Sequence, residues 1–470
     1  MVFSSPQFLF LFLPFVLLLT AWGSLCYQNV ALIACSLAFY YYSGGELIWL
    51  LLFSCGANWL MGLILDHSRS RLALLAGVLV NVGILVYYKY ANFIVSEINR
   101  WAHGTRWEIP QWSAVTLPIG ISFFTFQGMS YMLDVWRRET RAYRNPLDIL
   151  LCISFFPHLI AGPIVRINHL GQQLRQRSRS LDDMCAGASR FLWGLAKKVL
   201  IADYCARVAD AGFGSDADTL PPQAAWLALL AYTLQIYFDF SGYSDMAIGL
   251  ARLFGFRFPE NFNHPYASVS ITDFWRRWHM SLSQWFRDYL YIPLGGNRGP
   301  KFAHYRNVLF VFLVTGLWHG ASWTFVLWGL YHGILVACEH ALGLHKMEDD
   351  HRFATPRRAL TLLLVMGSWV LFRCKTFGDA LMFFQALGGR FHHQYVPVHV
   401  IDLMDLQTFL ALAFGVTSFF ARREGTGGRW IEAGTPRAMP FRWAMMLLVY
   451  PVILGQMFAT NYSPFLYFRF

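Results

Sequence analysis

Long runs of apolar residues recur along the whole sequence, and they limit the possible folds more than any other feature. A helix needs about 20 consecutive apolar residues to cross the hydrocarbon core of a bilayer. Runs at or near this length occupy residues 8–25, 30–42, 47–65, 72–90, 114–133, 147–165, 224–254, 307–339, 359–372, 406–420 and 443–458. We therefore expect roughly ten to a dozen membrane segments, because each crossing needs about that length.

The composition agrees with this interpretation. Soluble proteins carry about a quarter charged residues, whereas 14% of these 470 residues are charged and 56% are hydrophobic. The sequence therefore predicts an all-α polytopic integral membrane protein. We expect the first apolar run to be a retained anchor rather than a cleaved signal peptide, since no basic residue precedes it and the first one is Arg69.

The net charge of +11 has an ordinary explanation in a membrane protein. Lys and Arg accumulate in cytoplasmic loops, and the chain lacks the soluble basic surface that nucleic-acid binding needs. Two basic clusters, at residues 137–144 and 166–179, flank the single apolar run 147–165, although both have the composition of cytoplasmic loops. Proline and glycine interrupt that run. We therefore favour a re-entrant segment over a local failure of the charge rule.

The stretch from 268 to 340 begins with a cationic aromatic helix. Ser270 and Asp273 form a variant of the capping box, which predicts a helix start. Large apolar residues then recur every three or four positions, and the arginines fall largely on the other side. This pattern is typical of an amphipathic helix at a membrane interface. The sequence PLGG at 293–296 ends the helix.

Three histidines in this stretch are candidates for chemistry. His279 lies at the edge of the apolar face of the amphipathic helix. His319, in GLWHG, interrupts the apolar run 307–339, which is long enough for two short membrane passes or one broken pass. His332, in YHG, also lies between an aromatic residue and a glycine within this apolar run. An ionisable residue inside a membrane indicates a functional site by default, although an isolated helical histidine is more often structural.

Two carboxylates lie within another apolar run. Asp239 and Asp245 fall in FDFSGYSDMAIGLA, where Gly242 is expected to let the helix unwind and supply partners. We interpret both carboxylates as structural partners within a broken helix rather than as catalytic groups. The preceding segment 181–208 carries several basic residues and is expected to lie at the membrane interface.

Four motifs follow one another in a defined order: FDFSGYSDMAIG, NFNHPY, ITDFWRRWHMSLSQWFRDYLYIPLGGNR and GLWHGASWTFVLWGLYHG. Together they resemble the membrane-bound O-acyltransferase family, in particular its bacterial exopolysaccharide branch. KYANF, LPIGISF and FFPHLIAGPI extend the resemblance over most of the chain. The resemblance implies a helical bundle with a funnel or tunnel through the bilayer. It also implies one membrane domain over 1–470, with N-terminal helices over 1–99, a catalytic core over 224–342 and C-terminal helices over 343–470.

The resemblance also implies roles for the histidines. The family's intramembrane histidine corresponds to His319, its upstream partner to His279, and a third histidine of this branch to His332. His319 would be the general base that takes the proton of an acceptor hydroxyl as it attacks the thioester of acetyl-CoA, a task that suits neutral imidazole. His279 would orient the thioester, stabilise the oxyanion or hold the tautomer of His319.

The expected donor is acetyl-CoA, without a metal. Its phosphates could contact Arg276, Arg277, Arg298 and Lys301, although these residues serve equally well as interfacial anchors. The eight cysteines lie mostly in apolar segments without the spacing of metal ligands, so we expect them to pack as small hydrophobes.

The function implied by the resemblance is transfer of acetyl from cytoplasmic acetyl-CoA across the bacterial inner membrane for O-acetylation of an exopolysaccharide, alginate or cellulose. The sequence contains no soluble domain able to hold a polymer. Besides membrane lipid, we therefore expect a periplasmic acetyltransferase partner and a polysaccharide synthesis and export complex, and no nucleic acid. The alternatives are acyl transfer to teichoic acid or peptidoglycan, a transporter or flippase in which His319 relays protons, and a structural subunit of a secretion complex.

Overall fold

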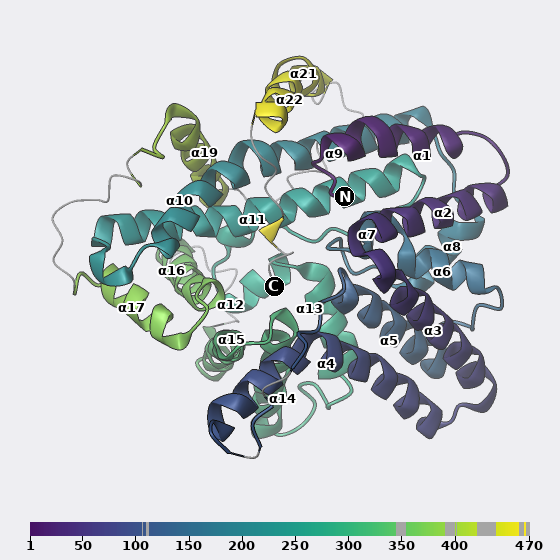
Figure 1. Cartoon of the computed structure of the whole chain (residues 1–470), viewed down its shortest axis with the longest axis horizontal. Coiled ribbons are helices and arrows are strands. Elements are labelled where there is room, and N and C mark those ends of the chain that lie inside the picture. Colours follow the sequence, from purple (N-terminus) through teal and green to yellow (C-terminus); the bar gives the residue numbers. More distant parts are fainter. Residues whose placement is uncertain are drawn as a thin grey trace. The chain divides into compact units, whose positions relative to one another are not determined.

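The computed structural model describes residues 1–105, 107–109, 112–344, 354–390, 400, 402–420, 439–459 and 465–466. Within these ranges every regular element is a helix and none is a strand, so the all-helical class is confirmed (Figure 1). The chain forms two compact units: Met1–Met184 with Leu250–Phe258, and Cys185–Gly249 with Pro259–Phe470. The expected division of one domain into 1–99, 224–342 and 343–470 stays a prediction.

The first unit contains the longest apolar stretches among the described residues. Its elements are the π-helix η1 (Phe8–Phe12), α1 (Leu13–Leu19), α2 (Leu25–Gly44), α3 (Ile48–Ser68), α4 (Arg71–Ala102), α5 (Ile121–Arg137), α6 (Pro146–Ser154), α7 (Phe156–Leu159) and α8 (Ile167–Arg175). Ser24 and Ser70 cap α2 and α4 through their hydroxyl oxygens. Two stretches, Leu25–Ser68 and Arg71–Ala102, have the length and apolar composition of membrane-crossing helices. The total of ten to a dozen crossings stays a prediction.

The apolar run 147–165 contains only two short helices. α6 has nine residues and α7 has four, so at about 1.5 Å per residue neither spans about 30 Å of hydrocarbon. At the break between them, the backbone N–H of Phe156 donates to Oγ of Ser36 on α2 at 3.1 Å. Arginines from both flanking basic clusters line one cavity, Arg141 and Arg144 from the first and Arg175 from the second. A re-entrant segment is compatible with this geometry, and it stays a prediction.

The second unit holds the elements that carry the candidate histidines. It contains most of α9 (Leu181–Ala196) and α11 (Pro222–Leu253), together with the π-helix η3 (Lys197–Ala202), α10 (Asp203–Gly214), α12 (Ile271–Arg277), α13 (Met280–Phe286), the π-helix η6 (Arg287–Tyr291), α14 (Lys301–His319), α15 (Trp323–Ala341), α16 (Ala354–Arg373), α17 (Phe377–Leu387), α19 (Leu406–Thr417), α21 (Met439–Ala444), the π-helix η10 (Met445–Val449) and α22 (Tyr450–Ala459).

The expected break of the helix at Gly242 is wrong, because α11 runs without interruption. The partners of its carboxylates come from a neighbouring element: Lys197 lies 2.6 Å from Asp245, and Lys198 lies 2.6 Å from Asp239. Gly242 permits this approach, since a Cβ there would lie 2.8 Å from the backbone oxygen of Gly194 on α9. The helix therefore stays intact, and its glycine serves packing.

The basic residues of segment 181–208 are buried, which differs from the helix at the membrane interface that the sequence predicts. An interfacial helix would direct its basic residues toward water and lipid headgroups. Arg190 and Lys198 are instead only 2% exposed, and Lys197 is 9% exposed. The structure thus corrects the prediction of an interfacial helix at these positions, since the three cations are held inside the second unit by ion pairs.

The apolar run 307–339 forms two helices, α14 and α15, rather than one broken pass. Each has 19 residues, about 28 Å of helix, which is close to the thickness of the hydrocarbon core. The two helices pack closely because glycines face each other: a Cβ on Gly316 would overlap the backbone oxygen of Phe325 and lie 3.1 Å from Cα of Gly329. This is the small-residue contact typical of membrane helices.

We predict that Gly316→Ala destabilises the protein by about 1–3 kcal/mol, because the added methyl group forces the two backbones apart. The measurement is thermal unfolding of the purified protein in detergent. Gly455→Ala on α22 is the matched control, since no atom lies within 4 Å of a Cβ there. Equal stability of Gly316→Ala and the wild type would contradict the close helix contact.

Candidate active site

The amphipathic helix predicted between Ser270 and the PLGG sequence at 293–296 starts as expected but breaks at the first candidate histidine. Oγ of Ser270 accepts from the backbone N–H of Asp273 at 2.9 Å, which confirms the predicted start. α12 then ends at Arg277, and α13 begins at Met280. Between them His279 adopts the left-handed conformation, with φ 43° and ψ 54°. Such a backbone costs about 1–3 kcal/mol in a residue other than glycine, and it often marks a functional site.

The segment around Asn261 holds this break in place. The backbone N–H of Met280 donates to the backbone oxygen of Asn261 at 2.9 Å, and that of Asn263 donates to the backbone oxygen of Arg277 at 2.9 Å. The chain on both sides of His279 is therefore paired with one neighbouring segment. This pairing supplies backbone hydrogen bonds that the interrupted helix cannot make.

The side chain of Asn261 determines which nitrogen of His279 carries the proton. Oδ1 of Asn261 lies 3.3 Å from the backbone N–H of Ser281, which can only donate, so this amide atom must be the oxygen. Nδ2 donates to Oγ of Ser244 at 3.1 Å. Nδ1 of His279 lies 3.1 Å from the same Oδ1 and must therefore donate to it. In the neutral ring Nε2 is then a hydrogen-bond acceptor.

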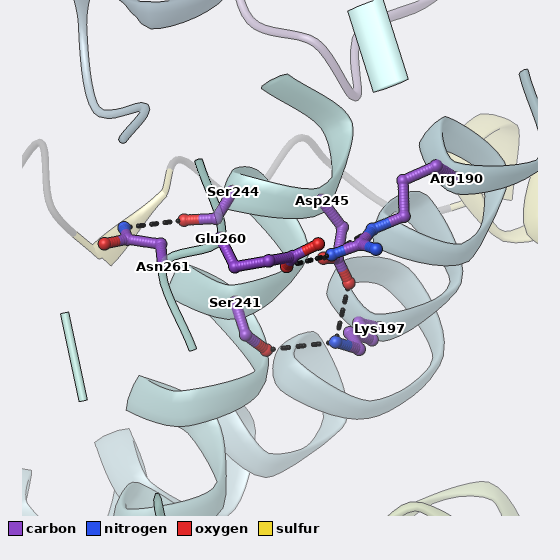
Figure 2. Close-up of polar contacts among 7 residues, drawn as sticks. All are labelled: Arg190, Lys197, Ser241, Ser244, Asp245, Glu260 and Asn261. Atoms are coloured by element: carbon purple, nitrogen blue, oxygen red, sulfur yellow. Dashed lines mark hydrogen bonds and ion pairs between the residues drawn. The ribbon is translucent and has the colours of Figure 1, made fainter. Parts of the chain in front are cut away.

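A buried ion cluster anchors the residue before Asn261 (Figure 2). The guanidinium of Arg190 lies between two carboxylates, 2.6 Å from Asp245 and 2.7 Å from Glu260. Lys197 lies 2.6 Å from the other oxygen of Asp245. Two cations and two anions thus balance, which a buried ion cluster requires. Because Glu260 precedes Asn261 directly, the cluster helps to position the residue that orients His279.

His319 is the last residue of α14 and is buried among aromatic rings. The ring centroids of Trp318 and Trp328 both lie 4.9 Å from its own, and that of Phe372 lies at 5.2 Å. His319 borders a cavity of about 10 Å³, enough for about one water molecule. Asp239 also lines this cavity, and its charge is paired with Lys198.

The three candidate histidines and two tryptophans form a continuous row of rings. The ring of Trp318 lies 6.0 Å from that of His279 and 4.9 Å from that of His319. Trp328 lies 4.9 Å from His319 and 5.0 Å from His332. The fold therefore brings together residues from the α12–α13 break, the end of α14 and the middle of α15.

His332 has the opposite tautomer to His279. The indole N–H of Trp275 lies 3.3 Å from Nδ1 of His332 and can only donate. Nδ1 is therefore an acceptor, and Nε2 carries the proton of the neutral ring. Phe274 stacks on the same imidazole with centroids 6.2 Å apart. His332 is completely buried, so this network holds it in one orientation.

A larger cavity of about 230 Å³ lies between α12, α13 and η6 on one side and α14 and α15 on the other. Trp275 lines it and also contacts His332, and Thr315 lines it one turn before His319. Most of the lining is apolar, with the cationic side chains of Arg276 and Arg287 in the wall. An apolar cavity with a few polar groups is the usual form of a ligand site.

The four basic residues proposed for phosphate contacts lie in different places. Arg276 lines the larger cavity. Arg277 instead pairs with Asp273 at 2.7 Å, within its own helix. Arg298 and Lys301 are exposed where α14 begins. Lys301 and His319 are at opposite ends of that helix, about 27 Å apart at about 1.5 Å per residue.

Sequence reasoning missed Asn261 and the cationic partners of α11. Asn261 lies in the motif NFNHPY, but nothing in its local pattern shows that it faces His279. Arg190, Lys197 and Lys198 carried a usable signal, because residues seven or eight positions apart share a helix face. Such a basic face beside an apolar run that holds two aspartates could have indicated buried ion pairs.

Comparisons with known proteins identify several relatives of this chain. A probable alginate O-acetylase from Pseudomonas putida is 42% identical, with 100% of each chain covered. A probable alginate O-acetylase from Pseudomonas aeruginosa is 44% identical over 90% of this chain and 82% of the relative. A peptidoglycan O-acetyltransferase from Helicobacter pylori is 36% identical over 83% of this chain and 80% of the relative.

The family model covers the histidines and most of the residues around them. It describes the membrane-bound O-acyltransferase family and matches residues 73–346. This range contains α11 to α15, the ion cluster, Asn261 and all three candidate histidines. Together with the full-length relatives, the match establishes that this chain belongs to the membrane-bound O-acyltransferase family.

Proposed function

We propose that this protein transfers acetyl groups from acetyl-CoA for the O-acetylation of alginate. The observation that carries the proposal is the 42% identity to a probable alginate O-acetylase over the whole of both chains. The row of buried histidines supports it, because acyl transfer to a hydroxyl needs a base in a site from which water is largely excluded.

His319 is proposed as the general base. Its imidazole takes the proton of the acceptor hydroxyl as that oxygen attacks the thioester carbonyl, and the CoA thiolate then leaves and is protonated. The position of His319 supports this role, because the carbonyl end of α14 lies at this residue. That end of a helix dipole stabilises the positive charge that a histidine acquires as a base.

The tautomer of His279 narrows its proposed role. With Nδ1–H donating to Asn261, neutral His279 presents an acceptor at Nε2. This nitrogen can align the hydroxyl that receives the acetyl group by accepting a hydrogen bond from it. Stabilising an oxyanion from Nε2 would require the protonated ring. We therefore propose that His279 positions the hydroxyl and that His332 supports the site through Trp275.

The cavity of about 230 Å³ is the proposed donor site. Its apolar walls suit the arm of a thioester donor, and Arg276 suits the donor's phosphates. Arg287 pairs with Asp288 at 2.8 Å, but its side chain is 63% exposed and can still reach a phosphate, whereas that of Arg277 is 12% exposed. Arg277 is better explained as a structural residue, because it pairs with Asp273. Arg298 and Lys301 are better explained as anchors at the other end of α14.

The proposed setting is the bacterial inner membrane, within a complex for polysaccharide synthesis and export. The immediate or next acceptor would be a periplasmic acetyltransferase that receives acetyl on its own hydroxyl. Two long apolar stretches, Leu25–Ser68 and Arg71–Ala102, support membrane insertion. Peptidoglycan is the second candidate acceptor, because a peptidoglycan O-acetyltransferase is 36% identical over 83% of this chain.

We predict that His319→Gln lowers acetyl-CoA turnover by about 10²–10⁴-fold, the usual contribution of a general base. The assay follows release of free CoA by the purified protein in detergent, with and without the periplasmic partner and with alginate or peptidoglycan fragments as final acceptor. His67→Ala is the control, because His67 is exposed at the end of α3. Full turnover by folded His319→Gln would exclude His319 as the base.

We predict that Asn261→Leu lowers kcat by about a hundredfold, the low end of the contribution of acid–base catalysis, with little change in KM for acetyl-CoA. The reason is that His279 loses the oxygen that holds its tautomer. Asn261→Asp keeps an acceptor at that position and should restore most of the rate. Ser244→Ala, which removes only the partner of Nδ2, is the milder control. Equal losses in the Leu and Asp variants would show that Asn261 acts through packing alone.

A further inference from the structure

Another cavity lies in the first unit, and none of the residues assigned to acyl transfer lines it. Its volume is about 540 Å³, within the range of small-molecule sites. The loop between α5 and α6 forms one wall, and the end of α8 forms the other. The lining residues are Thr140, Arg141, Ala142, Tyr143, Arg144, Gly171, Gln172, Arg175 and Gln176.

The cavity carries an excess of positive charge. Three of its lining residues are arginines, and none is acidic. Arg175 has a carboxylate neighbour, Asp148, at 3.6 Å. Among the residues that the structure describes, no carboxylate lies within ion-pair distance of Arg141 or Arg144. The side chains of both arginines are exposed, and they are therefore available to an anion from solution or from the membrane surface.

The loop that presents these arginines is held by other elements. The indole N–H of Trp59 on α3 donates to the backbone oxygen of Tyr143 at 3.0 Å. The backbone N–H of Tyr143 donates to the hydroxyl of Tyr131 on α5 at 3.1 Å. The side chain of Asn145 caps α6 by accepting from the backbone N–H of Leu147 at 3.1 Å. The wall is thus organised before any ligand arrives, which lowers the entropic cost of binding.

Gly171 lets the two walls of the cavity approach each other. A Cβ at this position would overlap the hydroxyl group of Tyr143. The same hydroxyl donates to the backbone oxygen of Ile167 on α8 at 3.4 Å. The loop and α8 are therefore joined beside the arginines, so that the cavity has a defined shape.

We propose that this cavity binds a phosphate group through Arg141, Arg144 and Arg175. Guanidinium groups match the geometry of phosphate oxygens and can bind them in pairs. The three arginines come from the basic clusters 137–144 and 166–179, which have the composition of cytoplasmic loops. Basic pockets at the cytoplasmic surface of membrane proteins bind anionic headgroups. The phosphate belongs either to an anionic phospholipid or to a soluble phosphate compound, because the same arginines recognise both.

Two binding measurements distinguish the sources. In the first, native mass spectrometry follows lipid retained by the full-length protein from micelles with equal amounts of phosphatidylglycerol and phosphatidylcholine. In the second, inorganic phosphate and pyrophosphate are titrated calorimetrically into the protein in lipid-free neutral detergent. The variants are Arg141→Gln and Arg144→Gln. Arg138→Gln is the charge-matched control, since Arg138 belongs to the same loop but does not line the cavity.

We expect one of the two ligands to bind and each cavity variant to weaken it about tenfold, as loss of a charge-assisted hydrogen bond does. Preference for phosphatidylglycerol that falls in both variants would identify a lipid site. Binding of phosphate or pyrophosphate that falls in both variants would identify a soluble ligand. The proposal is overturned if neither ligand distinguishes the wild type from the cavity variants, or if Arg138→Gln has the same effect. Unchanged thermal unfolding of the variants excludes loss of fold as the cause.

Discussion

The buried ion cluster of Arg190, Lys197, Asp245 and Glu260 is the interaction on which the candidate site depends. Charges inside a membrane protein are tolerated when each is paired, and removal of one partner typically costs about 3–5 kcal/mol. The cluster joins α9, η3 and α11 to the segment around Asn261 (Figure 2). That segment in turn pairs with the chain around His279. The ion pairs of the cluster therefore help to position the backbone that pairs with the chain around His279.

The row of histidines and tryptophans gives chemically similar groups different properties. Asn261 places the proton of neutral His279 on Nδ1, whereas Trp275 leaves the proton of neutral His332 on Nε2. His319 lies between these two rings, separated from each by one tryptophan. The three imidazoles can thus have different roles because their partners differ: His279 as a hydrogen-bond acceptor, His319 as a base and His332 as a rigid support.

The errors of sequence reasoning share one physical cause, which is that a helix pattern does not report its tertiary partners. The apolar periodicity continues through 271–289 although α12 ends before His279, because backbone pairing with the Asn261 segment compensates for the interruption. Gly242 does not break α11 as its sequence predicts, because lysines from η3 neutralise the carboxylates of the intact helix. By contrast, the predicted helix start at Ser270 depended only on local hydrogen bonds and is confirmed.

The sequence by itself determined the helical class, through apolar runs of bilayer length, and the family, through motifs around His279, His319 and His332. Both follow from local order along the chain. Only the tertiary structure decided that these histidines share one row of rings, that Asn261 sets a tautomer, and that two separate basic clusters line one cavity. Those contacts join residues far apart in the sequence, and their energies come from burial, which no local pattern encodes.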